Sequence, residues 1–327
     1  HLSMILHLLM YELNYTMSEL KQKKIQDILS KYRRAGEISI GAKKLAKKII
    51  KPGVNIWEAG EKIENYIIEN GAYPAFPINI STNNEAAHYS PDILDDRIIP
   101  KKSIIKVDLG AHIDGYLVDT AITLNFNPDF DNLSKASEEA LDAVISVAKA
   151  GTKISELGTL IEKIITQAGY EPIRNLSGHQ IKRYVLHAGV TIPNASPSFI
   201  DRPQGRLQLG RIYAVEPFAS NGKGLIENGN ITNIFRFVNP PSKKQKELIP
   251  LYNRYKSKVG VLPFSPMHLY GFDTSEDKLG IYMNLRKLLR ANIITGYPIL
   301  IEKDRKAMVS QFEHTLRITN NGCEVLT

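Results

Sequence analysis

The sequence has almost no cysteine and no long apolar run, and both absences restrict what the protein can be. Its single cysteine, Cys323, can form neither an intramolecular disulfide nor a thiolate metal site, which suits a reducing compartment. The apolar opening Leu2–Met10 is too short to span a bilayer and lacks the positive region and cleavage site of a signal peptide. We therefore expect a cytoplasmic protein without a membrane partner, although a short amphipathic anchor is an alternative for this segment. Any metal ion must be held by histidine and carboxylate side chains.

Positive charge exceeds negative charge, with a net charge of +8 and a pI of about 9.2 in 327 residues. Such a balance invites a nucleic-acid interpretation, so the location of the charge matters. Lysines gather in 21–51 and 243–290. The first stretch is interpreted as two helices with a solvated face that carries Lys43, Lys44, Lys47 and Lys48. Because no basic motif interleaved with aromatic residues is present, and 43% hydrophobic with 23% charged residues is ordinary for a globular enzyme, we expect no DNA partner.

Two acidic residues, Asp108 and Asp119, interrupt a stretch that otherwise has the pattern of an apolar β-hairpin. The flanking runs are β-branched and alternate, and Asp114 with Gly115 favours a two-residue turn between them. With this turn, Asp119 lies opposite Gly110, and Asp108 projects from the same face about 7–8 Å away at the Cα level. A buried unpaired carboxylate is costly, so two on one face predict a compensating cation. The alternative is a surface hairpin whose acids face water.

An internal repeat organises the chain. A shift that carries Gly53 onto Gly151 also superposes a series of isoleucine, glutamate and glycine residues at helical spacing. Gly71 and Gly169 stand where each helix would end in the left-handed conformation. Each copy is therefore predicted to be a helix delivered onto a following strand. Duplicated α+β halves typically face each other across a pseudo-twofold axis, and the cleft between them receives ligands from both halves.

Histidines and further strand-borne acids point to this cleft. His88 and His179 follow the two copies of the repeat, and Glu216 and Glu313 each lie in or beside an apolar strand. The resulting oxygen-rich set with a single imidazole is Asp108, Asp119, His179, Glu216 and Glu313. Such a set suits divalent manganese, cobalt, iron or zinc, and two ions about 3.5–4 Å apart activate a shared water for hydrolysis. The alternative is several independent buried acids, each with its own partner.

Five segments with these residues run in order through the chain. They are Asn84-Glu85-Ala86-Ala87-His88-Tyr89-Ser90-Pro91, Val107-Asp108-Leu109-Gly110 with Asp119-Thr120-Ala121, Asn175-Leu176-Ser177-Gly178-His179 with Leu186-His187-Ala188-Gly189, Glu216-Pro217-Phe218, and Gln311-Phe312-Glu313-His314-Thr315. Together they resemble the type 2 methionine aminopeptidases, in a short archaeal-like form, from about residue 20 to the C-terminus. The resemblance implies a pita-bread α+β fold with duplicated halves, two divalent metal ions, and removal of the initiator methionine before a small second residue.

The resemblance also implies roles for the five metal-binding positions. Asp108 would chelate one ion, and His179 with Glu216 would hold the other. Asp119 and Glu313 would bridge the two. The free amine of the substrate would coordinate a metal ion and so restrict the enzyme to N-termini.

Other residues gain roles from the same resemblance. His88 and His187 would line the cleft and contact the scissile carbonyl or the following amide. Glu216 would also carry a proton from the bridging water to the leaving amine. Phe76 and Tyr297 resemble residues that wall the methionine pocket, with plain core aromatics as the alternative.

The domain organisation is predicted from the same comparison. The parts are an N-terminal extension or expression remnant at 1–16, a catalytic domain at 17–223 and 296–327, and a helical, winged-helix-like insertion at 224–295 with helical patterns at Lys243–Lys258 and Lys278–Arg290. The expected partners are the N-termini of nascent polypeptides, and the protein is expected to be a monomer. A further hypothesis makes the basic insertion a contact to the ribosome.

Two rival functions share these features. X-Pro aminopeptidases and dipeptidases resemble this chain in the five metal ligands, but generally carry a large N-terminal domain, and only a few dozen residues precede the first repeat helix here. A non-catalytic relative that binds RNA or protein partners typically loses ligands, whereas all five are present. Metal analysis and a comparison of Met-Ala-Ser with an X-Pro peptide distinguish these possibilities.

Overall fold

The computed structural model describes residues 2–197, 205–270 and 277–327. Its helices are α1 (Leu2–Ile49), α2 (Ile56–Glu69), α3 (Asp131–Val147), α4 (Ile154–Gln167), α5 (Ile249–Val259), α6 (Pro266–Tyr270) and α7 (Lys278–Arg290), with 3₁₀ turns at Pro128–Phe130 and Lys246–Leu248. Its longer strands are β2 (Asn79–Thr82), β4 (Ile104–Ile113), β5 (Tyr116–Asn125), β7 (Ser177–Ile181), β9 (Ile212–Val215), β11 (Ile226–Phe237), β12 (Ile294–Glu302) and β14 (His314–Ile318). Its short strands are β1 (Tyr73–Pro74), β3 (Glu85–Ala87), β6 (Glu171–Pro172), β8 (Thr191–Pro193), β10 (Phe218–Ser220), β13 (Val309–Gln311) and β15 (Cys323–Val325).

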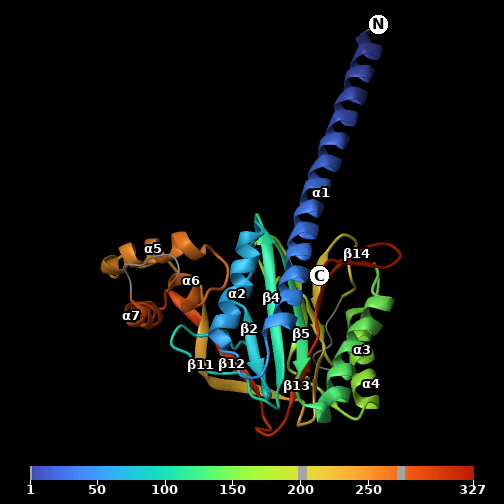
Figure 1. The fold of residues 1–327 in the computed structure, drawn as a ribbon. Coiled ribbons are helices and arrows are strands. Elements are labelled where there is room, and N and C mark those ends of the chain that lie inside the picture. Colours follow the sequence, from blue (N-terminus) through green and yellow to red (C-terminus); the bar gives the residue numbers. More distant parts are fainter. Residues whose placement is uncertain (1, 198–204, 271–276) are drawn as a thin grey trace.

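The strands form two main antiparallel sheets, one from each half of the chain. In the first, β4 pairs with β1, β2 and β5, and in the second the order is β15-β14-β9-β7-β8. Helices α1 and α2 pack beside the first sheet, and α3 and α4 lie together on the other side of the body (Figure 1). The two sheets meet where Ala121 of β5 pairs with Glu313, just before β14.

The predicted repeat is present in the structure. Helices α2 and α4 each contain 14 residues, and each presents an apolar face to the interior. Gly71 and Gly169 follow these helices at φ 86° in both cases, the left-handed conformation that was predicted from the sequence. The expectation of duplicated α+β halves is therefore confirmed.

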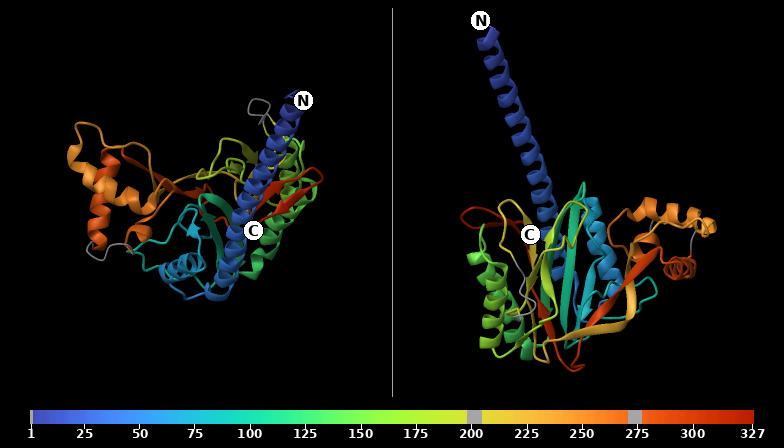
Figure 2. Two further views of the ribbon diagram at one scale, coloured as in Figure 1. Left: turned by 90° about the horizontal axis from the view of Figure 1, so that it is seen from above. Right: turned by 180° about the vertical axis from the view of Figure 1, so that it is seen from behind.

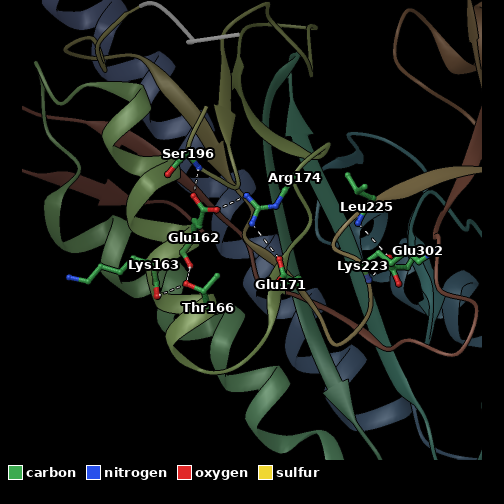
Figure 3. Close-up of polar contacts among 9 residues, drawn as sticks. All are labelled: Glu162, Lys163, Thr166, Glu171, Arg174, Ser196, Lys223, Leu225 and Glu302. Carbon is green, nitrogen blue, oxygen red and sulfur yellow. Dashed lines mark hydrogen bonds and ion pairs between the residues drawn. The ribbon is translucent and has the colours of Figure 1, made fainter. Parts of the chain in front are cut away.

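Two equivalent glutamates have the same role in the two halves but different partners. Glu162 of α4 accepts a hydrogen bond from the Arg174 guanidinium at 2.5 Å and another from the Ser196 backbone N–H at 2.9 Å (Figure 3). Its counterpart Glu64 accepts from the Ile78 backbone N–H at 2.8 Å, and its carboxylate also lies 3.0 Å from Nε2 of His268 on α6. In both halves the acid ties the repeat helix to the chain that follows it.

The region between β11 and β12 lies to one side of the body. The two strands pair along their length, and β12 also pairs with β3. Helices α5, α6 and α7 lie beyond this ribbon (Figures 1 and 2). Glu302, at the end of β12, accepts backbone hydrogen bonds from Lys223 and Leu225 and so fixes the base of the ribbon (Figure 3). The division of the chain at 224–295 stays a prediction.

Two expectations about helices were wrong. The stretch 21–51 was predicted to form two helices, but its residues 21–49 belong to one continuous helix, α1, which projects well beyond the body (Figures 1 and 2). The helix continues through Gly36 and Gly41. These glycines lie against the Leu326 carbonyl and the Tyr66 hydroxyl, where a Cβ would collide. The pattern at Lys243–Lys258 forms a helix only over Ile249–Val259, because a 3₁₀ turn precedes it and Pro250 occupies its first turn.

The solvated face predicted for the first lysine cluster was also partly wrong. Lys44, Lys47 and Lys48 are exposed as expected, but Lys43 is only 8% exposed. Its Nζ donates a hydrogen bond of 2.8 Å to Oγ1 of Thr120 on β5. Among the described helices, none is long and apolar enough to cross a membrane.

Candidate active site

The predicted β-hairpin has the expected turn and register. Asp114 and Gly115 form its turn at φ 52° and 80°, and Gly110 lies opposite Asp119. Asp108 lies opposite Ala121 and therefore projects from the same face of the sheet as Asp119. The side chains of both acids are directed into the interior, so the alternative of a water-facing surface hairpin is wrong.

The structure brings together all five residues of the predicted metal set. Nε2 of His179 lies 3.5 Å from the Asp119 carboxylate and 3.6 Å from the Glu216 carboxylate. The potential ligand atoms of Asp119, His179 and Glu313 all lie within 4.8 Å of one another. Asp108 joins the group because the Gln311 amide contacts the carboxylates of Asp108, Glu216 and Glu313 at 3.2, 3.5 and 3.3 Å. The set combines residues from both halves of the repeat.

The pKa values of the four acids are raised, whereas that of the imidazole is lowered. Burial raises the pKa of Asp119 to about 7. Burial and the neighbouring carboxylates raise the pKa values of Asp108, Glu216 and Glu313 well above the usual range. Burial lowers the pKa of His179 to about 4, which keeps the imidazole neutral at physiological pH. Four acids that resist ionisation beside a neutral imidazole have the electrostatics of a site that requires a cation.

The donor atoms fit divalent metal ions. Among the described residues, no hydrogen-bond partner is present for Oδ1 of Asp108, Oδ1 of Asp119 or Oε1 of Glu313, although all three atoms are buried. Unpaired buried carboxylate oxygens are rare in proteins because each carries a desolvation cost. Carboxylates able to bridge, with one neutral imidazole, suit borderline divalent ions, and the ligand types do not select among cobalt, manganese, iron and zinc.

A cavity of ≈ 230 Å³ opens onto this cluster. Four other residues that were predicted for substrate contact also line it, namely Phe76, His88, His187 and Tyr297. The rings of His187 and His179 are 4.2 Å apart, and those of His88 and Tyr297 are 5.9 Å apart in an edge-to-face arrangement. Phe76 and Tyr297 both line the cavity, although Phe76 also packs in the hydrophobic core, so their role in a methionine pocket stays a prediction.

The two cavity histidines are held as neutral rings. Nδ1 of His88 lies 3.3 Å from the Pro298 carbonyl, which favours a proton on Nδ1. The unprotonated Nε2 is then available as a hydrogen-bond acceptor in the cavity. Burial lowers the pKa of His88 to about 4 and that of His187 to about 3. His88 has φ 64°, and its backbone N–H donates to Oδ1 of Asn79, which compensates for the strained conformation.

The sequence analysis did not identify two contributors. Gln311 was quoted only as part of a motif, yet its amide contacts three of the four acids. Strand alternation was the available signal, because Gln311 and Glu313 are two residues apart. Lys43 lies behind the site, where its positive charge opposes the rise in the pKa of Glu313. No local pattern in α1 distinguishes Lys43 from the exposed lysines around it.

Two α+β halves that converge on a buried set of four carboxylates and one imidazole, below a cavity, define a metal-dependent hydrolase. A model of metallopeptidase family M24 matches residues 30–253, and the chain belongs to this family. A methionine aminopeptidase of Saccharolobus solfataricus is 43% identical over 307 residues, which cover 92% of this chain and 98% of the relative. One of Pyrococcus horikoshii is 42% identical over 91% of this chain and 99% of the relative.

Solved structures share the fold at lower identity. A thermophilic Arx1 superposes with a TM-score of 0.79 at 20% identity, covering 92% of this chain and 90% of that one. A methionine aminopeptidase from Thermotoga maritima gives 0.65 at 20% identity, with 92% and 96% covered. A prolidase from Pyrococcus furiosus gives 0.58 at 19% identity, and only 64% of the prolidase is covered. These likenesses confirm the pita-bread fold with its duplicated halves.

Proposed function

We propose that this chain is a metal-dependent aminopeptidase that removes the initiator methionine from new polypeptides, with a preference for a small second residue. The observation that carries the proposal is the convergence of Asp108, Asp119, His179, Glu216 and Glu313 below one cavity. The curated relatives support methionine as the first residue, because they are named methionine aminopeptidases and match almost their whole length.

The five side chains would hold two divalent ions, with Asp108 on one, His179 and Glu216 on the other, and Asp119 and Glu313 shared between them. Bound ions of this kind acidify a shared water and stabilise negative charge on a carbonyl oxygen. They also neutralise the acids, whose pKa values are raised by burial and mutual repulsion. The free amine of the substrate would bind at this metal site, which would restrict cleavage to the N-terminus.

Glu216 is suited to transfer the proton. Its side chain is 14% exposed, more than that of Asp119 or His179 at 6% each, and it lines the cavity. A carboxylate at the cavity surface is within reach of a water molecule there and can act as a general base. In this proposal Glu216 takes a proton from the attacking water and delivers it to the leaving amine.

His88 and His187 contact the reacting peptide group in different ways. Both rings are neutral at physiological pH, because burial lowers their pKa values to about 4 and about 3. A neutral imidazole donates from one ring nitrogen only. His187 can therefore donate to the carbonyl oxygen, whereas His88, whose Nδ1–H is directed to the Pro298 carbonyl, offers Nε2 as an acceptor for the N–H of the following amide. The positions of both rings in the cavity wall allow them to contact the scissile carbonyl or the following amide.

The methionine side chain would occupy the apolar part of the cavity. Phe76 and Tyr297 line it together with Ile234, Leu300 and Pro263. A flexible thioether chain fills such an irregular aromatic and aliphatic surface well. This arrangement favours methionine over a charged first residue, since these five lining residues offer no charged group to pair with a charged substrate side chain.

The proposal is tested with metal-free protein to which manganese, cobalt, iron or zinc is added in turn. We expect methionine to be released from Met-Ala-Ser, much less from Met-Lys-Ser, and none from a peptide with a blocked amine. Replacement of Asp119 by alanine removes a bridging ligand, so turnover should be lost. Faster cleavage of an X-Pro peptide would favour the prolidase activity instead, and no metal uptake would favour a non-catalytic relative.

The cellular setting is also a proposal. We propose that the protein acts as a monomer in the cytoplasm, where nascent N-termini emerge, and that the basic insertion contacts the ribosome. The exposed Lys243, Lys244 and Lys246 support the last point, because clustered lysines bind phosphate backbones. Association with ribosomes that falls with added salt is the expected result. Association that is insensitive to salt, or no association, would remove the hypothesis.

A further inference from the structure

A second groove, of ≈ 240 Å³, lies beside the active-site cavity. One wall belongs to the catalytic body and includes Tyr73, His112 and Tyr184. The other is 257–263, which comprises the end of α5 and the chain that leads from it to α6. Pro263 lines both the groove and the active-site cavity, so the two spaces are neighbours. The groove therefore lies between the body and the helices of the β11–β12 region.

The groove continues the active-site cavity along three segments of chain. Each segment lines both spaces, as shown by the pairs Phe76 and Tyr73, Asp108 and His112, and His187 and Tyr184, in which the first residue lines the cavity and the second lines the groove. Asp108 and His112 point to the same face of β4, about 13 Å apart along the strand. An extended peptide has nearly the same rise per residue, so a substrate chain reaches the groove about four residues beyond the scissile bond.

The body wall of the groove is an exposed row of aromatic rings. The rings of Tyr73 and His112 are stacked at 5.8 Å, and those of His112 and Tyr184 meet edge to face at 5.9 Å. Tyr73 is 61% exposed and Tyr184 is 41% exposed. Large aromatic surface that lies open beside a catalytic cleft is typical of a binding site.

Tyr184 is held in this row by a strained backbone. Its φ is 55°, which is unfavourable for a bulky side chain. The Tyr184 backbone N–H donates to the Gly115 carbonyl at 2.8 Å, and its ring lies so close to Gly115 that a Cβ there would collide with it. The Arg183 side chain also donates to the Asp114 carbonyl at 2.8 Å. The hairpin turn thus fixes the orientation of the ring, and such compensated strain is a mark of functional sites.

We propose that this groove binds the peptide substrate about four residues beyond the scissile bond and favours apolar side chains there. The inference deepens the proposed aminopeptidase function and rests on it. The opposite wall supplies aliphatic surface from Val259, Val261 and Leu262, and among the described residues no acidic side chain lines the groove. The substrate is the occupant that the geometry favours, because Pro263 and three chain segments line both spaces, so a chain that starts in the active-site cavity can extend into the groove.

Three peptides test the inference: Met-Ala-Ser, Met-Ala-Ser-Gly-Leu-Phe-Ser-Lys, and the octapeptide with glycine in place of its leucine and phenylalanine. We expect kcat/KM to be about fivefold higher for the apolar octapeptide than for the glycine octapeptide, as burial of part of one or two apolar side chains provides. The double variant Tyr73→Ala with Tyr184→Ala should reduce this ratio to less than about twofold. Its rate on Met-Ala-Ser should stay unchanged.

A matched control is Tyr270→Ala, since Tyr270 is 38% exposed and lies outside the groove lining. This variant should keep the preference of the wild-type protein. The Tyr184→Phe variant should also keep it, because the aromatic surface remains. Equal rates of the wild-type protein on both octapeptides, or an unchanged preference in the double variant, would overturn the inference. Failure to cleave Met-Ala-Ser would instead remove the proposed function itself.

Discussion

Replacement of Asp119 by asparagine should make the metal-free protein more stable while it abolishes activity. Asp119 is 4% exposed and lies between His179 and the carboxylates of Asp108 and Glu313. Its buried negative charge destabilises the folded state when no cation compensates it. Asparagine has nearly the same shape and carries no charge, and its amide can donate to a neighbouring carboxylate.

The magnitude follows from the pKa of the carboxyl group. Burial raises the pKa of Asp119 from 3.8 to about 7 in the folded protein. Each unit corresponds to 1.36 kcal/mol, so ionisation of this one group costs the fold about 4 kcal/mol at pH values above 7. Loss of this charge also reduces the repulsion on the neighbouring acids. We expect the Asp119→Asn variant to gain about 2–4 kcal/mol in the free energy of unfolding at pH 8.

The effect has a defined dependence on pH. Because the folded pKa is higher than the unfolded value, the folded state binds more protons between about pH 4 and pH 7, and the contribution of this group to stability falls as the pH rises through that window. Urea unfolding in the presence of a chelator at pH 5 and pH 8 measures the difference. The advantage of the variant should be less than about half as large at pH 5 as at pH 8, where it is full.

Added metal should reverse the order. Ions that bind only the folded wild-type protein stabilise it by about 4.1 kcal/mol at a concentration of 1,000 Kd, which exceeds the expected gain of the variant, and the variant lacks one ligand. The control is Asp142→Asn, on the exposed side of α3, which should change the unfolding free energy by less than about 0.5 kcal/mol. A metal-free Asp119→Asn protein that is less stable than the wild type at pH 8 would refute the reasoning.

Three further substitutions test the surroundings of the site. Gln311→Leu removes the amide that contacts three carboxylates, and we expect calorimetric titration to show about 10–100-fold weaker metal binding; unchanged affinity would exclude this role. Lys43→Met leaves buried polar partners unpaired and should lower the unfolding free energy by about 1–3 kcal/mol, whereas the same change at exposed Lys44 should have no effect in the same urea titration. Gly115→Ala should lower Tm, because φ is 80° and a Cβ would meet an aromatic ring, while Gly322→Ala, with open space, should not; equal Tm values would contradict the argument.

Local patterns in the sequence predicted the parts of the fold that depend on neighbouring residues. The turn at Asp114 and Gly115 fixed the register that places Asp119 opposite Gly110, because a two-residue loop allows only one pairing. The left-handed glycines after α2 and α4 were equally predictable, since both ends of the repeat carry the same signal. The set of metal-site acids emerged because charged residues inside apolar strands are rare enough to be noticed.

Contacts between distant segments were beyond the reach of such patterns. Lys43 has the helical spacing of a surface lysine, and its burial depends on where α1 crosses β5, about which its neighbours in sequence carry no information. The continuous course of α1 also depends on tertiary contacts, because Gly36 and Gly41 are tolerated where a carbonyl and a tyrosine approach the helix. The aromatic groove was missed because its walls come from five separate parts of the chain.

The candidate metal centre lies at the seam where the two halves join, and this position explains its chemistry. The side chain of Thr315 accepts from the Asp119 N–H and donates to the Asp119 carbonyl, at 2.7 Å in each case, while Thr120 donates to the Glu313 carbonyl at 2.7 Å. Threonine hydroxyl groups thus replace part of the strand pairing across the seam and hold Asp119 and Glu313 side by side. The carboxylates proposed to bridge the metal ions therefore come from opposite halves, so ion binding should strengthen the contact between the halves as well as activate water.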